Sequence, residues 1–175
     1  MKTYDLYAES GPMKKKTVVH VPSVMGCTAH GDTTDAALAA TPDVIRAYLR
    51  FLVRAGERVD AEAVFAIRLA DHDTSGGFLG SAFLPTDHQP LLKRDSNALM
   101  KRLGALHDEL RRTAGGLPAK TLDARPPIGR AIRQIMLHVC GSEGGYLRGV
   151  TGASRLHREV EQGNLSPHDA LDQLY

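Results

Sequence analysis

The chain has 175 residues, of which 42% are hydrophobic and 24% are charged, and its formal net charge is +2. This composition excludes a largely disordered chain, and the length allows one large domain or two small ones. The sequence contains no apolar run of the roughly 20 residues that a membrane-spanning helix needs, and its N-terminus lacks the pattern of a secretory signal. We therefore expect a cytoplasmic protein without a membrane partner.

The two cysteines, Cys27 and Cys140, lie far apart and have neither metal-binding nor redox spacing. We expect both to be reduced thiols, as is usual in the cytoplasm. The second half of the chain is mildly basic, but no basic run is interleaved with aromatic residues. These charges indicate solvated surface, and we expect no nucleic-acid partner.

Residues 1–72 predict an α+β module with the order β-β-β-α-β. Residues 3–9 alternate in polarity, which places Tyr4, Leu6 and Ala8 on one face of a half-buried strand. Further along, residues 63–70 predict the last strand of the module, and the segment 73–90 that follows has the composition of a linker.

The middle of this module contains a second strand, a turn and a short third strand. The second strand covers 17–22 and ends at Pro22, which lacks the N–H group that a strand ladder needs. A tight turn is expected at Gly26, and the third strand ends at Gly31. The lysines at 14–16 could contact phosphate, although lysines in such a turn commonly discourage edge-to-edge strand pairing, and we favour that interpretation.

An amphipathic helix follows the third strand. Asp32 or Thr33 can cap its first turn, and Gly56 is a plausible stop. Pro42 predicts a kink, or a restart of the helix with Thr41 as the cap. The predicted apolar stripe of this helix consists of Val44, Ile45, Tyr48, Leu49, Leu52 and Val53.

A family pattern runs through the strand, the turn and the helix start. Its residues are Val21, Pro22, Gly26, Cys27, Gly31, Asp32 and Thr33. This arrangement resembles the HicB-like antitoxin family. The resemblance implies a small binding module with a reduced ribonuclease-H fold, a structural position for Cys27, and a small ribonuclease toxin as a partner. Neither a helix-turn-helix nor a ribbon-helix-helix signature follows residue 60, so an added DNA-binding segment is not expected.

Two kinds of enzymatic chemistry were weighed for this module. Two-metal nuclease chemistry needs converging carboxylates, but Asp32 and Asp35 already suit the helix start, and no acidic residue is placed mid-strand opposite Asp5. A nucleophilic Cys27 with His30 as its base is conceivable, but closeness in sequence is no evidence for an activated thiolate. We expect neither a nuclease nor a catalytic cysteine.

Residues 91–175 predict an incomplete α-helical bundle. A first helix over 91–113 would carry a leucine face and end at glycine. That face consists of Leu92, Leu99, Leu103, Leu106 and Leu110. Pro126 and Pro127 would open a second helix, whose predicted buried stripe consists of Ile128, Ile132, Ile135, Val139 and Tyr146.

Two shorter helical segments are expected after these. The first covers 153–162, and the second begins at Ser166, which can cap a helix with Pro167 in its first turn. This last segment would have only about nine residues, and isolated helices of that length are marginal. We therefore expect that it docks on another element, or that the natural chain is longer.

A second resemblance lies in this helical region. The run 135–139, followed by Glu143, Tyr146 and Leu147, resembles a helix of DinB-like four-helix bundles. Some members of that family hold a divalent metal through three histidines, which implies His138 as one ligand of a zinc or nickel ion. The other two ligands of the family form an HxxxH pair, and no two histidines of this chain are four residues apart. The candidates to complete a site are His107, His157 and Glu143.

These patterns together predict a non-enzymatic, protein-binding module of HicB type fused to a shortened DinB-like bundle, with no cofactor. The alternative is a DinB-like metal-dependent transferase or hydrolase. We expect a homodimer, because the short sheet leaves unpaired edges and because Leu137 is predicted to lie opposite the buried stripe of its helix. A small toxin-like protein is the other possible partner.

Overall fold

The computed structural model describes residues 1–12, 16–76, 84–127, 129–146, 153–166, 169 and 173. They form a mixed α+β structure, as predicted. By its internal contacts the chain divides into two compact units, Met1–Arg102 (unit 1) and Leu103–Tyr175 (unit 2). The division falls inside helix α2 (Lys93–Ala114).

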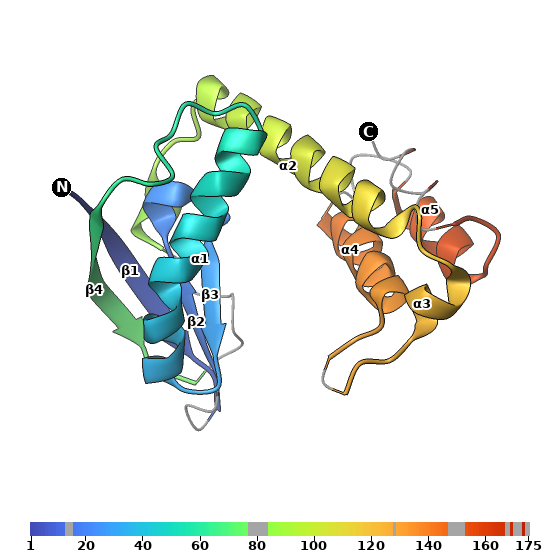
Figure 1. The fold of residues 1–175 in the computed structure, drawn as a ribbon, viewed down its shortest axis with the longest axis horizontal. Helices are drawn as coiled ribbons and strands as arrows, with labels where there is room; N and C mark the ends of the chain where they lie inside the picture. The colour runs from blue at the N-terminus through green and yellow to red at the C-terminus, as the bar shows by residue number, and fades with distance from the viewer. Residues whose placement is uncertain are drawn as a thin grey trace. The chain divides into compact units, whose positions relative to one another are not determined.

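Unit 1 is built on a four-stranded sheet with the strand order β3-β2-β1-β4. Its elements are β1 (Lys2–Ser10), β2 (Thr17–His20), the 3₁₀ helix η2 (Pro22–Val24), β3 (Thr28–Gly31), α1 (Thr34–Arg54), β4 (Phe65–Asp73) and the 3₁₀ helix η3 (Pro85–His88). Strands β1, β2 and β3 form an antiparallel meander, whereas β4 pairs with β1 in parallel. A parallel neighbour requires a crossover connection, and α1 supplies it by crossing one face of the sheet (Figure 1).

The core of unit 1 lies between this face and α1. The alternation predicted for the first strand is confirmed, since Tyr4, Leu6 and Ala8 are all buried. The stripe predicted for the helix is only partly correct, because Phe51 is buried and Val53 is exposed. The residues that α1 buries are Ala37, Thr41, Ile45, Leu49, Phe51 and Leu52.

Both ends of α1 are capped by local hydrogen bonds. Thr33 is the N-cap, and its Oγ1 accepts a hydrogen bond from the Ala36 N–H at 3.1 Å. At the other end Gly56 has a positive φ of 85°, and its N–H and that of Glu57 donate to carbonyl oxygens of the last turn. The predicted stop at Gly56 is therefore confirmed, and the cap is Thr33 rather than Asp32.

The restart predicted at Pro42 is wrong. Helix α1 is continuous across the proline, and the Thr41 hydroxyl donates to the Ala37 carbonyl oxygen at 2.8 Å instead of capping a new helix. Proline removes one backbone hydrogen bond from a helix interior. Burial of Ile45 and Leu49 beyond this point offsets that loss, since tertiary packing supplies most of the stability of a protein helix.

Unit 2 contains the end of α2 together with α3 (Ala119–Asp123), α4 (Ile132–Tyr146) and α5 (Ala153–Glu161). The predicted helices over 91–113 and 153–162 correspond to α2 and α5, and α3 was not predicted. Helix α4 begins at Ile132 rather than at the two prolines. Ser166 accepts a hydrogen bond from the Asp169 N–H at 3.0 Å, as a cap should. Apart from Gln173, the remainder of that last segment lies outside the described residues.

The faces predicted for the long helices of unit 2 need correction. On α4, Ile135 is 42% exposed whereas Met136 is only 5% exposed, so the predicted stripe is wrong at Ile135. Val139, another member of that stripe, packs against Val160. Leu137 was predicted to point away from the core, but it packs against Val160 of α5. On α2, Leu106 is exposed and His107 is buried. Ile128 and the side chain of Tyr146 lie outside the described part of the chain.

Within the residues that the structure describes, no helix is both long enough and apolar enough to span a membrane.

The contact between β3 and α1 yields a first prediction. A Cβ added at Gly31 would lie 2.4 Å from the Ala37 backbone nitrogen, so Gly31→Ala must push the strand end away from the helix. We expect the free energy of unfolding of unit 1 to fall by about 1–3 kcal/mol, the usual cost of overpacking. Hydrogen exchange of the β1 amides measures this quantity.

Gly104→Ala is the matched control, because an added Cβ there meets nothing within 4 Å. It should leave β1 protection unchanged. Equal protection in the Gly31→Ala protein would contradict the prediction.

Candidate functional site

The loop between β2 and β3 holds the first residues of the family pattern. Pro22 stands at the start of η2, and the Val21 N–H donates to the Cys27 carbonyl oxygen at 3.1 Å, which closes the loop. Gly26 has a positive φ of 92°, and a Cβ there would lie 2.6 Å from the Tyr48 hydroxyl oxygen. The turn geometry therefore favours glycine at this position, and an added Cβ would also displace the end of the Tyr48 side chain.

Cys27 has the environment of a structural residue. It is 2% exposed, and burial raises the pKa of its thiol to about 11. The His30 side chain is exposed, and its Nε2 lies 3.5 Å from Thr28 Oγ1. The thiol is thus neither accessible nor activated, which does not fit the nucleophile that was weighed from the sequence.

A charged anchor holds the other side of this loop. The Arg102 guanidinium donates to both carboxylate oxygens of Glu57, one of them at 2.9 Å, and also to the Met25 carbonyl oxygen at 3.1 Å. The hydrogen bonds from Arg102 lower the pKa of Glu57 below its usual value. The Tyr48 hydroxyl donates to the same Met25 carbonyl at 2.8 Å. The sequence does not predict these contacts, because Arg102 lies far along the chain from Glu57 and Met25 and no local pattern connects them.

A cluster of hydroxyl groups joins four elements at one end of the sheet. Ser10 of β1 lies 3.1 Å from the Thr17 hydroxyl of β2 and 3.2 Å from the Thr34 hydroxyl of α1, and the two threonine hydroxyls are 3.0 Å apart. Nε2 of His72, on β4, lies 2.7 Å from Ser10 Oγ. We call these four residues the hydroxyl cluster. No pattern in the sequence predicts the hydroxyl cluster. His72 is the last residue of the module predicted over 1–72.

A serine hydrogen-bonded to a histidine can be a nucleophile with its general base. In the hydroxyl cluster, however, Ser10 is 3% exposed, and its hydroxyl is shared with two threonines. A substrate carbonyl could not approach such a group. The arrangement instead satisfies buried polar groups, which would otherwise cost free energy.

The face of the sheet opposite the core carries ion pairs. Successive side chains of a strand point to opposite faces, so Asp5 and Glu9 lie on this second face. Arg68 of β4 donates to both carboxylate oxygens of Asp5, at 2.7 and 2.9 Å, and lowers the pKa of Asp5. His20 Nε2 lies 3.1 Å from a carboxylate oxygen of Glu9. The carboxylate weighed for nuclease chemistry is therefore paired with a cation.

The two outer strands of the sheet differ in length. Strand β3 has four residues, whereas β4 has nine and is half-buried or exposed along its whole length. Residues Phe65–Leu69 of β4 pair regularly with Lys2–Leu6, and an irregularity follows. Leu69, at the end of this regular part, is 42% exposed. One edge of the sheet thus presents a long strand with an apolar side chain at the surface.

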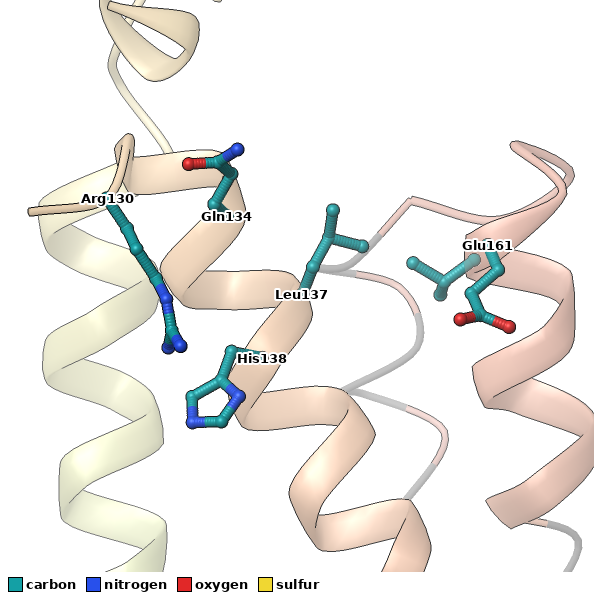
Figure 2. Close-up of a pocket in the computed structure, with 6 residues that line it drawn as sticks. Arg130, Gln134, Leu137, His138 and Glu161 are labelled. Carbon is teal, nitrogen blue, oxygen red and sulfur yellow. The ribbon is translucent and has the colours of Figure 1, made fainter. Parts of the chain in front are cut away.

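His138 lies on α4 in an open groove of about 600 Å³ in unit 2 (Figure 2). The residues that line the groove are Arg130, Gln134, Leu137, His138, Val160 and Glu161. The buried His107 is not among them, and the side chains of His157 and Glu143 lie outside the described residues. In the part of the chain that the structure covers, no three His, Cys, Asp or Glu side chains form a group that could hold a metal ion.

Comparisons with protein-family models, with curated proteins and with solved structures give no match for this chain.

The hydroxyl cluster generates a second prediction. Ser10→Ala removes the hydroxyl that contacts the other three residues of the cluster. The buried Thr17 hydroxyl then loses Ser10 as a hydrogen-bond partner. We expect the free energy of unfolding of unit 1 to fall by about 1–3 kcal/mol. Hydrogen exchange of the β4 amides provides the measurement.

Thr3→Ala, an exposed change on the same strand, serves as the control. Equal protection of β4 in the Ser10→Ala and Thr3→Ala proteins would show that the cluster does not stabilise the sheet.

The environment of Cys27 gives a third prediction. With a pKa of about 11, its thiolate fraction at pH 8 is roughly a hundredfold smaller than that of an exposed thiol with a pKa near 8.5. We expect iodoacetamide to alkylate Cys27 at least about a hundredfold more slowly than it alkylates a model peptide thiol. Peptide mass spectrometry separates Cys27 from Cys140, and urea should abolish the difference. Rapid alkylation in the native protein would contradict a buried structural role.

Proposed function

We propose that unit 1 is a non-enzymatic, protein-binding module of HicB-like type that associates with a second copy of itself. The strand order with parallel β1 and β4, the covering helix, and the structural positions of Gly26 and Gly31 support the HicB-like assignment. On the same reasoning, unit 2 is a shortened DinB-like bundle. A small toxin-like protein remains a candidate for a further partner.

The groups in unit 1 that could supply chemistry are engaged in structure. Asp5 is paired with Arg68, Ser10 is enclosed in the hydroxyl cluster, and the Cys27 thiol is buried with a raised pKa. Binding, rather than turnover, is the role that such a site supports best.

The observation that carries the proposal is the outer edge of β4. An edge strand presents backbone N–H and C=O groups that lack partners within the sheet, and another strand can pair with them. The regular part, Phe65–Leu69, has an exposed leucine at its end, next to Arg68, whose charge is paired with Asp5.

A second copy of the chain is the simplest occupant of this edge. Two copies of β4 running antiparallel around a two-fold axis would give a continuous sheet and a closed dimer. Backbone hydrogen bonds would supply affinity, as in other interactions that add a strand to a sheet edge. The short β3 offers less than half as many residues for the same purpose.

Light scattering coupled to size exclusion tests the proposal. We expect the wild-type protein at micromolar concentration to have twice the monomer mass of 18.9 kDa. In a dimer of this kind, Leu69→Lys places one positive charge from each copy at the shared edge. It should weaken the dimer by at least about tenfold in Kd, which corresponds to about 1.4 kcal/mol.

Val64→Lys is the matched control, because Val64 is 74% exposed and immediately precedes β4. It adds the same charge outside the edge strand and should leave the dimer intact. A wild-type mass of 18.9 kDa would disprove self-association, and a dimer insensitive to Leu69→Lys would place the interface elsewhere.

A further inference from the structure

The groove in unit 2 has two chemically different parts. Arg130, which precedes α4, and His138, on α4, extend from the same side of the helix, and their polar ends lie near each other (Figure 2). Leu137 of α4 and Val160 of α5 pack together and form the apolar part. Glu161 lies beyond Leu137, on the far side of the groove from Arg130 and His138.

The basic part matches a carboxylate. A guanidinium presents parallel N–H donors with the spacing of the two carboxylate oxygens, and an imidazole N–H adds a donor from another direction. Arg130 and His138 are both exposed, so a ligand can reach them from solvent. His138 is held on α4, and Arg130 lies two residues before the first residue of that helix.

The apolar part narrows the choice of ligand. Leu137 is half-buried and packs against the buried Val160, so an aliphatic or aromatic group could lie against this part of the groove and leave water. A volume of about 600 Å³ is within the usual range for small-molecule sites.

We propose that this groove binds a small carboxylate with a short apolar body. Arg130 and His138 would hold the carboxylate, and Leu137 and Val160 would contact the apolar body. The site lies wholly in unit 2 and is independent of the strand-edge association of unit 1.

A nitrogen-15 NMR titration with hexanoate tests the proposal on the full chain. We expect saturable shifts of the Gln134, Leu137 and His138 amides at millimolar ligand concentration, with a Kd below about 20 mM. Arg130→Gln should raise the Kd by at least about tenfold, because hydrogen bonds to charged groups are the strong ones. His138→Gln should raise it by a smaller factor.

Arg125→Gln is the matched control, since Arg125 is also exposed and does not line the groove. It should bind hexanoate as the wild-type protein does. 1-Hexanol tests the need for the carboxylate. It should bind at least about fivefold more weakly than hexanoate.

Three results would overturn the inference. They are the absence of saturable shifts, an affinity for 1-hexanol equal to that for hexanoate, and an Arg130→Gln protein that binds as tightly as the Arg125→Gln control.

Discussion

The hydroxyl cluster is the constraint on which unit 1 depends. β1 lies between its antiparallel neighbour β2 and its parallel neighbour β4, and Ser10 stands at its end. There its hydroxyl meets groups from β2, from the start of α1 and from β4. The antiparallel meander, the crossover helix and the parallel strand are therefore connected at one point by contacts between polar side chains. Apolar packing alone would hold these elements together without defining where each one ends.

Small residues set the distances that this arrangement requires. Gly31 allows the end of β3 to approach the first turns of α1 more closely than any side chain would permit. Gly26 does the same for the Tyr48 hydroxyl, which together with Arg102 holds the Met25 carbonyl. These glycines belong to the pattern that resembles HicB-like antitoxins, and each has a local geometric reason. That part of the pattern can thus be explained as a requirement of the fold, separately from any partner.

Features that depend on local patterns could be predicted from the sequence, whereas contacts between polar groups distant in the chain could not. The alternation of Tyr4, Leu6 and Ala8 and the end of α1 at Gly56 follow local rules, and both are confirmed. On α4 apolar residues occur at several consecutive positions, so spacing could not decide that Met136 rather than Ile135 is buried. The hydroxyl cluster and the pairing of Arg102 with Glu57 join residues of ordinary surface type across long separations, and no local pattern indicates such contacts. The resemblance to DinB-like bundles singled out His138, but its exposure and its neighbour Arg130 became clear only in three dimensions.

The parallel pairing of β1 with β4 has a consequence for the order in which the protein folds. Lys2 lies opposite Phe65, so the first strand to leave the ribosome gains its second neighbour only after the whole of α1 has been synthesised. The meander and the helix contain mostly local contacts and can form early, whereas the last pairing must close a long loop, which is slow. Until then, one side of β1 remains open to strands from other nascent chains. The edge of β1 that β4 finally covers is therefore open to incorrect pairing while the chain is being synthesised.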